Sequence, residues 1–255
     1  MRIPLPCRYY EELLLKKLVD VVSRTKCECI ALSGGIDTST ILLACILAGL
    51  KPKAIAVVYK EGVPKDLPYI IYISKLFNVN LDLVMLDFKD ILNVKGDIIN
   101  CVGDELNSHG DGGCIEFRND VVFYTALRRA REINCNCIYI GSGGDELLLG
   151  YNFLLTLPSS EVDNTVKKFI HGRYPELEIS KCLGVKAVAP FLEHDVVELL
   201  LTIPLDCLRS ERLLGKEVLR NILESYGLDV IAFRRKTPAE DGSGTKSICK
   251  SIYDY

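Results

Sequence analysis

The stretch that decides the fold of this chain is Ala31-Leu32-Ser33-Gly34-Gly35-Ile36-Asp37-Thr38-Ser39-Thr40. A short apolar run, residues 30–32, precedes the two glycines, and an unbroken helical pattern over residues 41–50 follows them. The order strand, tight glycine turn and helix start directs backbone N–H groups, hydroxyls and the positive end of a helix at one point. Such a point attracts an anion, most simply a phosphate. The alternative is an ordinary strand-to-helix turn in which a Ser or Thr caps the helix.

The composition is that of a folded protein with a large core. The chain has 255 residues, 49% of them hydrophobic, and a net charge of −3, which suffices for one large or two small domains and excludes a disordered chain. No run of about 18 uncharged apolar residues is present, so we expect no membrane span. The N-terminal residues lack a signal-peptide core, and we expect a cytoplasmic location. The absence of a long basic run argues against a nucleic-acid partner.

Strand and helix patterns alternate over the first 155 residues. Apolar spacing predicts a helix over residues 9–24 that packs on a sheet. Strands are predicted at 29–32, 54–59, 81–86 and 137–140, and helices at 41–50, 67–77 and 117–133. This alternation predicts a parallel sheet covered on both faces. The glycine-containing segment 87–116 is predicted to be an irregular, mobile loop near the site.

The strand pattern fades beyond Tyr151. Helices are predicted at 161–174, 193–203 and 213–226, and prolines separate them. We therefore divide the chain into an α/β nucleotide-binding part, residues 1–155, and a helical part, residues 156–255, that completes the site.

A second glycine-rich turn, Gly141-Ser142-Gly143-Gly144-Asp145-Glu146, follows the strand predicted at 137–140. Ligands of open parallel sheets bind beyond the carboxyl ends of the strands. If the strands before the two turns are neighbours, Asp37 and Asp145 face one cavity, where two carboxylates beside a phosphate suit Mg²⁺. The alternative places each Asp in the first turn of a helix, where the dipole favours it. Two matching turns favour the metal site.

Four segments together resemble a known family. Residues 33–39, SGGIDTS, resemble the SGGxDS pyrophosphate loop of the ATP pyrophosphatases (the PP-loop superfamily), which include asparagine, GMP and NAD synthetases and tRNA-thiolating enzymes. Residues 143–151, GGDELLLGY, resemble the GSDExFGGY motif of the asparagine synthetases. Residues 184–193, GVKAVAPFLE, resemble their GVExRVPFLD motif, and residues 236–244, KTPAEDGSG, their late lysine motif. The four motifs stand in family order across residues 28–244.

The resemblance to the asparagine synthetase family implies a fold and site roles. The fold would be a five-stranded parallel sheet with helices on both faces, like the adenine nucleotide alpha-hydrolases, plus a helical C-terminal part. Asp37, Asp145 and Lys236 would be catalytic, and both aspartates would bind Mg²⁺. Contacts to ATP would come from Leu32, Ser33, Gly34, Gly35, Asp37, Thr38, Ser39, Val58, Arg118, Gly141 and Ser142. Lys236 would stabilise negative charge at the α-phosphate; its alternative is a solvated surface lysine.

The implied reaction is amide formation at the cost of ATP. A carboxylate, of aspartate or another acid, would form an acyl adenylate and pyrophosphate, and ammonia would then displace AMP. Two alternatives remain open. The first is a pyrophosphate-loop enzyme that modifies or thiolates a nucleobase or tRNA, for which Cys114 and Arg118-Asn119 are the supporting residues. The second is a non-catalytic ATP-binding subunit. A homo-oligomer also remains open.

Three features depart from the family pattern. Position 2 is Arg2, where the family's glutaminase part has its nucleophilic cysteine. We therefore expect the enzyme to use free ammonia or a separate glutaminase subunit. Ser142 occupies the position of a catalytic glutamate, and a serine cannot act as a carboxylate at neutral pH. Lys186 and Val188 replace an acid and an arginine, so the contacts to the acid substrate differ from the family's.

Eleven cysteines are many for a cytoplasmic chain. Frequent Cys with two Met and no Trp is compatible with a thermophile that uses intracellular disulfides. Cys29 and Cys137 each precede a glycine turn, so the pairs Cys27/Cys29 and Cys135/Cys137 meet at the opposite end of the sheet if the strands are neighbours. One interpretation is disulfides or a structural thiolate site. The other, which we favour, is four buried reduced thiols.

Overall fold

The structure is a computed structural model that describes residues 2, 4–103, 114–209 and 215–248. Its centre is a five-stranded sheet in the order β3-β2-β1-β4-β5, with every neighbouring pair parallel. The strands are β1 (Cys29–Ala31), β2 (Lys53–Tyr59), β3 (Leu81–Leu86), β4 (Cys137–Tyr139) and β5 (Lys186–Val188). The chain runs outward from β1 to β3 and then returns to β4, so the strand order reverses between β1 and β4. The predicted α/β class with a parallel sheet is confirmed.

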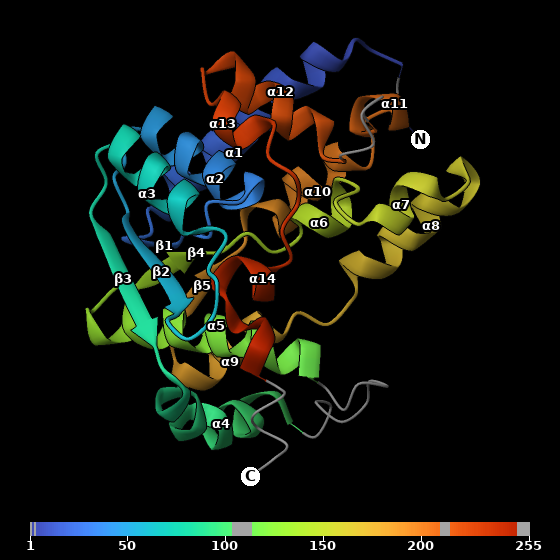
Figure 1. Cartoon of the computed structure of the whole chain (residues 1–255). Helices are drawn as coiled ribbons and strands as arrows, with labels where there is room; N and C mark the ends of the chain where they lie inside the picture. The colour runs from blue at the N-terminus through green and yellow to red at the C-terminus, as the bar shows by residue number, and fades with distance from the viewer. Residues whose placement is uncertain (1, 3, 104–113, 210–214, 249–255) are drawn as a thin grey trace.

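Helices cover both faces of the sheet (Figure 1). One face carries α1 (Cys7–Thr25), α2 (Ile36–Leu47) and α3 (Leu67–Leu76), and the other carries α4 (Phe88–Val102), α5 (Cys114–Glu132) and α9 (Pro175–Leu183). Successive residues of β2 therefore enter different cores: Ala54 packs with the first set of helices and Ile55 with the second. Burial on both faces explains why this strand reads as a continuous apolar run.

The remaining elements lie outside these layers. They are α6 (Gly144–Leu147), α7 (Asn152–Thr156), α8 (Ser159–Ile170), η2 (Pro190–Leu192), α10 (His194–Leu200), α11 (Leu205–Leu208), α12 (Glu217–Ser225), α13 (Asp229–Ala232), α14 (Ala239–Ser243) and η3 (Thr245–Ser247). Among them, α12 packs against α1 and α2, and α14 packs against α5. The division of the chain at residue 155 stays a prediction. Strand β5 and helix α9, which follow that point, pack against the sheet of the first part.

Three local predictions were wrong. The helix after the first turn begins at Ile36 rather than residue 41, because Gly35 is its N-cap. Residues 88–102 of the predicted loop form α4, which a capping box between Asp87 and Asp90 starts. Residues 114–116 of that loop begin α5, and residues 104–113 lie outside the described residues. The helical second part also contributes β5, whose length of three residues is too short to show a strand period.

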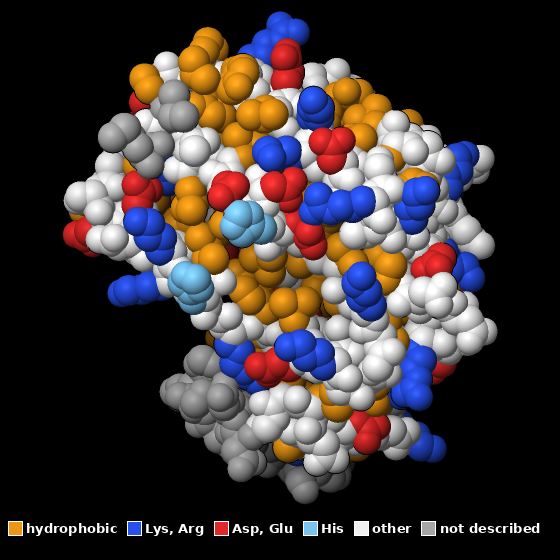
Figure 2. All heavy atoms as spheres, turned by 180° about the vertical axis from the view of Figure 1, so that it is seen from behind, with side chains coloured by type: hydrophobic (Ala, Val, Ile, Leu, Met, Phe, Trp, Pro, Cys, Tyr) orange, Lys and Arg blue, Asp and Glu red, His pale blue; other side chains and the backbone are white. Residues whose placement is uncertain are grey.

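The surface on the face opposite that of Figure 1 is mixed in charge. Figure 2 shows lysine and arginine side chains interspersed with aspartate and glutamate there, which is the pattern of an ordinary solvated surface. Within the described ranges of the chain, no helix combines the length and the apolar character needed to cross a membrane. The expected cytoplasmic location stays a prediction.

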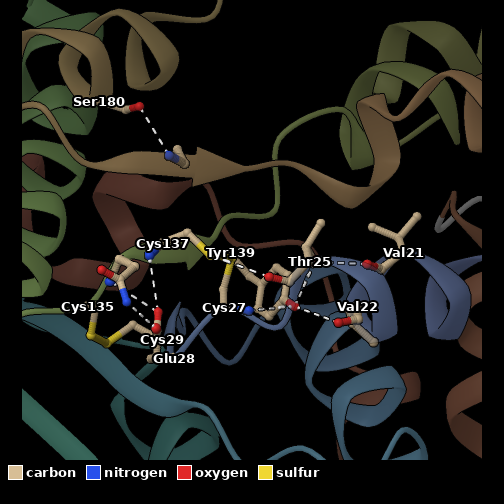
Figure 3. The surroundings of a disulfide bond; sticks show 12 residues. Val21, Val22, Thr25, Cys27, Glu28, Cys29, Cys135, Cys137, Tyr139 and Ser180 are labelled. Atoms are coloured by element: carbon tan, nitrogen blue, oxygen red, sulfur yellow. Dashed lines mark hydrogen bonds between the residues drawn. A yellow bond between two sulfur atoms is a disulfide. The ribbon is translucent and has the colours of Figure 1, made fainter.

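Two disulfides join β1 to β4 at their amino ends (Figure 3): Cys27–Cys137 and Cys29–Cys135. The interpretation as reduced thiols was wrong. The parallel pairing of the strands brings the Cα atoms of the two pairs to 4.8 Å and 6.1 Å, which is within bridging distance. Beside them, the Glu28 carboxylate accepts hydrogen bonds from the backbone N–H groups of Asn136 and Cys137 at 3.1 and 3.2 Å.

Other disulfides connect elements far apart in the sequence. Cys7–Cys207 joins α1 to α11, and Cys101–Cys182 joins α4 to α9. Cys114 is also disulfide-bonded, which removes the free thiol that supported the thiolation alternative. Among the described cysteines, Cys45 is a buried free thiol, and burial raises its pKa to about 12.

Titration of the unfolded protein without reductant will show far fewer than the eleven thiols of the sequence. The double variant Cys27→Ala/Cys137→Ala should lose about 2–4 kcal/mol of unfolding free energy in urea, because an open loop restores entropy to the unfolded chain. Cys45→Ala, which opens no disulfide, is the control for the loss of a buried sulfur. Reaction of all eleven thiols without reductant would show that the disulfides do not form.

Candidate active site

The first glycine turn lies at the carboxyl end of β1 and gathers two hydroxyls at the start of α2. The Ser33 and Thr38 hydroxyl oxygens are 3.0 Å apart, and the Gly35 N–H donates to Ser33 Oγ at 3.2 Å. Gly34 has φ +66°, and a Cβ at this position would lie 2.8 Å from the backbone nitrogen of Ile70. The turn therefore requires a glycine at position 34, both for its backbone conformation and for its close approach to α3.

The second glycine turn packs directly against the first. A Cβ on Gly141 would lie 3.1 Å from Thr38 Cγ2, and one on Gly144 would overlap Asp37 Oδ1. Both turns border one cavity of about 1030 Å³ whose lining includes Asp37 and Asp145. The prediction that these aspartates share a cavity agrees with this geometry, since β1 and β4 are neighbours.

Two lysines complete a network with the two aspartates. Lys216 Nζ lies 2.5 Å from Asp37 Oδ2 and 2.8 Å from Asp145 Oδ1, and Lys236 Nζ lies 2.7 Å from Asp145 Oδ1. Lys236 also stands over the Tyr151 ring, 4.1 Å from its centroid. A Cβ on Gly150 would overlap both Asp145 and Lys216, so this glycine leaves room for the pair. Sequence reasoning found Lys236 but missed Lys216.

Burial and neighbouring charges shift the pKa values of the network residues in different directions. Burial raises the pKa of Asp37 to about 6; the Asp145 carboxylate adds to that effect, and Lys216 opposes it. Burial alone would also raise the pKa of Asp145, but the Lys216 and Lys236 cations outweigh it and lower that pKa to about 2. Burial acts to lower the pKa of Lys216, yet the two carboxylates raise it above its usual value. The network therefore holds Lys216 and Asp145 charged at neutral pH.

The donor set suits a magnesium ion held together with phosphate. Within the described residues, Asp37 Oδ1 is buried and has no hydrogen-bond partner. Mg²⁺ prefers such hard oxygen ligands and is usually bound by one or two carboxylates together with substrate phosphates. The carboxylates of Asp37 and Asp145 fit that requirement, and the lysines at 216 and 236 would balance the charge of a polyphosphate.

The predicted contact residues fall into two groups. Those that line the cavity are Leu32, Ser33, Gly35, Asp37, Thr38, Gly141, Ser142, Asp145 and Lys236. Gly34, Ser39, Val58 and Arg118 are not part of its lining. Ser39 and Val58 are buried in α2 and β2, and Arg118 donates to Cys114 Sγ on α5 at 2.9 Å. Whether any of these residues touches a nucleotide stays a prediction.

Arg234 ties the lysine-bearing segment to the first turn. Its Nη1 donates to the Gly34 carbonyl at 2.6 Å, Nη2 pairs with Asp66, and the guanidinium stacks 4.1 Å from the Tyr69 ring centroid. Arg234 is buried, so the basic cluster at 234–236 contains one structural residue beside Lys236. Local sequence does not distinguish the two residues, because both side chains are cations and they stand two positions apart.

A carboxylate missed by the sequence reasoning lies beside Ser142. The Ser142 hydroxyl donates a hydrogen bond to Glu176 Oε1, from the first turn of α9. Nearby, the Tyr151 hydroxyl donates to Glu146 Oε1 at 2.5 Å, and the Gly143 N–H donates to Glu146 Oε2 at 3.1 Å. This wall of the cavity is therefore acidic, and Tyr151 contacts both its Glu146 carboxylate and the Lys236 cation.

Comparison with known proteins shows the family of this chain. The sequence model of the asparagine synthase family matches residues 14–172 and 176–254. The chain belongs to the asparagine synthase family. A curated relative, the putative glutamine-hydrolysing asparagine synthetase 1 of Methanocaldococcus jannaschii, is 27% identical over 52% of this chain and 31% of its own length. Asparagine synthetase B of Escherichia coli is 26% identical over 50% of this chain and 24% of its own length.

This member of the asparagine synthase family thus aligns with less than a third of each of these relatives' length. Two solved structures were also matched. The NMN synthetase of Francisella tularensis has 12% identity and a TM-score of 0.39, covering 98% of this chain and 95% of its own. The NH3-dependent NAD synthetase of Campylobacter jejuni has 17% identity and a TM-score of 0.35, covering 92% of this chain and 98% of its own. At these scores neither likeness bears on the site.

Replacing Lys216 will destabilise the asparagine synthase fold of this chain. Lys216→Met leaves two buried carboxylates without their shared cation and should lower the unfolding free energy by about 3–5 kcal/mol. Urea denaturation followed by circular dichroism measures the change. Lys181→Met, which replaces an exposed lysine on α9, is the matched control, and equal stability of the two variants would contradict the network.

A second prediction separates backbone strain from the steric clash of an added Cβ at Gly34. Gly34→Ala and Gly49→Ala both place a Cβ on a residue with positive φ, but the Cβ at Gly49 meets nothing within 4 Å. Each should lose stability from backbone strain of about 1–3 kcal/mol. Gly34→Ala should lose more, because its Cβ meets the backbone of α3. Thermal unfolding measures both variants, and equal shifts would refute the close approach.

Proposed function

We propose that this chain is an ATP- and Mg²⁺-dependent amide-forming ligase that adenylates a carboxylate and transfers ammonia, releasing AMP and pyrophosphate. The observation that carries the proposal is the network of Asp37, Lys216, Asp145 and Lys236 at the point where the strand order reverses. Nucleotides bind at this point of open α/β sheets. Membership of the asparagine synthase family supports the same reaction class.

Each part of the network has a task in this reaction. The N–H groups at the start of α2 and the hydroxyls of Ser33 and Thr38 hold the pyrophosphate part of ATP. Mg²⁺, held by Asp37 and Asp145, supplies charge neutralisation at the phosphates. Lys236 is partly exposed at the cavity, and its cation stabilises the negative charge that develops as the carboxylate attacks the α-phosphate. Lys216 holds both aspartates in place through its two ion pairs.

The acceptor is a small carboxylic acid, aspartate or another acid, and the nitrogen donor is ammonia. Free ammonia or a glutaminase supplies it in this proposal. Lys186 and Val188 lie on β5, and they differ in charge and polarity from the acid and arginine of the family pattern. An acid other than aspartate therefore belongs in any substrate test.

A non-catalytic ATP-binding subunit is the second candidate, because Ser142 replaces a glutamate. The retention of both aspartates and two paired lysines favours catalysis, since binding alone does not need a cation at the α-phosphate. The nucleobase-thiolating alternative has lost one of its supporting residues, because Cys114 is disulfide-bonded.

The test is acid-dependent pyrophosphate release from ATP–Mg²⁺ with ammonium chloride, across a panel that includes L-aspartate, L-glutamate and succinate. We expect at least one acid to stimulate release of pyrophosphate and AMP in equal amounts. Asp37→Ala should lower the rate by about 100-fold or more, because it removes a metal ligand and the partner of Lys216. Asp195→Ala, on α10 beside Arg24, is the control and should keep the wild-type rate.

Two outcomes would contradict the ligase. If no acid stimulates pyrophosphate release while ATP still binds, the chain is a binding subunit. If AMP forms only when sulfide and tRNA are present, the chain is a thiolating enzyme. Binding of ATP, measured by calorimetry on the same preparation, separates the first outcome from an inactive sample.

A further inference from the structure

The carboxylate of Glu176 reaches the place that Ser142 holds in the second turn. Ser142 stands three positions before Asp145, and its hydroxyl donates to Glu176 Oε1. Both residues line the cavity that also contains Asp145 and Lys236. Helix α9 therefore supplies a carboxylate at this wall of the site, where the family pattern has one on the glycine turn.

Glu176 is buried without a cation to neutralise it. Its residue exposure is 8%, and among the described residues no lysine or arginine forms an ion pair with it. Arg173, which lines the same cavity, is engaged by Glu116 at 2.5 Å and Glu178 at 2.8 Å. An unpaired buried carboxylate in a cavity is costly, which indicates that it has a ligand or a proton to bind.

The surroundings of Glu176 favour a cationic or protonated guest. Asp120 on α5 lines the same cavity, and its Oδ2 is buried without a hydrogen-bond partner in the described part of the chain. Burial, with Glu116 and Glu176 as neighbours, raises the pKa of Asp120 to about 8. Burial and the Glu146 carboxylate likewise raise the pKa of Glu176, against the Ser142 hydrogen bond, which lowers it. This wall attracts ammonium and accepts protons.

We infer that Glu176 is the catalytic proton acceptor for the nitrogen nucleophile, and that Ser142 is the positioning residue that orients its carboxylate. The inference rests on the proposed ligase function. It gives the acidic wall a task distinct from that of the lysines, which serve the phosphates.

The proton and electron balance of the transfer step is as follows. Bound ammonium gives one proton to the Glu176 carboxylate, which releases it to solvent. The nitrogen lone pair then forms the C–N bond with the acyl carbon of the adenylate. The C–O bond to the phosphate breaks, and its electron pair leaves on AMP. The nitrogen gives a second proton to Glu176 as the neutral amide forms.

The experiment separates the two half-reactions in the 255-residue chain. Adenylation is measured as exchange of labelled pyrophosphate into ATP with the acid that scores highest in the panel, and transfer as amide formation with ammonium chloride. Glu176→Gln keeps the Ser142 hydrogen bond and should leave exchange near the wild-type rate. Amide formation should fall by about 100-fold or more, which is the usual contribution of a positioned base.

Matched variants identify the cause of the loss. Glu178→Gln removes a carboxylate of the same helix that pairs with Arg173 and should leave both half-reactions unchanged. Ser142→Ala should slow transfer less than Glu176→Gln, because the Glu176 carboxylate stays in the cavity and loses only its hydrogen-bond donor. Ser142→Glu combined with Glu176→Gln puts a carboxylate back on the glycine turn and should restore amide formation.

The choice of nucleophile gives a readout that misfolding would not reproduce. Hydroxylamine is mostly uncharged at neutral pH, whereas ammonia is mostly ammonium, so Glu176→Gln should retain more activity with hydroxylamine than with ammonium. Two outcomes would overturn this inference and leave the proposed function standing. One is amide formation at the wild-type rate in the Glu176→Gln variant. The other is an equal loss of both half-reactions in Glu176→Gln and Ser142→Ala. Absence of acid-dependent exchange in the wild-type protein would overturn the proposed function and this inference with it.

Discussion

The parallel pairing of β1 with β4 is the contact on which the rest of this structure depends. The two strands are distant in sequence, and each ends in a glycine turn. Their pairing puts the turns side by side, brings Asp37 against Gly144, and opens a cavity beyond both strand ends. At the other end it brings four cysteines within bridging distance. The hydrogen bonding of β1 to β4 therefore determines both the position of the site and the pairing of these cysteines.

The charged network follows from that pairing and has a cost of its own. Two carboxylates held close together in a buried place repel each other, and Lys216 is the group that makes their approach tolerable. Buried charges lose hydration, and only good geometry with several partners offsets the loss. The glycines at 144 and 150 provide that geometry by leaving space where any side chain would collide. Within the described residues, Asp120 on α5 and Glu176 on α9 have no ion-pair partner, and burial raises the pKa of each.

Much of the fold and half of the site were predictable from local sequence patterns. The turns at residues 33–39 and 141–146, the first four strands and most of the long helices follow from periodicity and glycine placement, which act over a few residues. Lys216 was not predictable, since its partner Asp37 lies 179 positions away and nothing local marks a buried lysine. Glu176 was missed for the same reason. The disulfides needed the strand register, which a single sequence does not show.

The disulfides also bear on how the chain reaches this structure. Cys7 and Cys207 are 200 positions apart, and Cys27 and Cys137 are 110 apart. During synthesis the first cysteine of each pair is made long before the second. Neither bridge can therefore close until the whole segment between its two cysteines exists. Cys27 and Cys29 also stand two positions apart, as do Cys135 and Cys137, so only a formed strand register distinguishes the correct partners. The covalent bonds therefore record a fold that non-covalent packing has already selected.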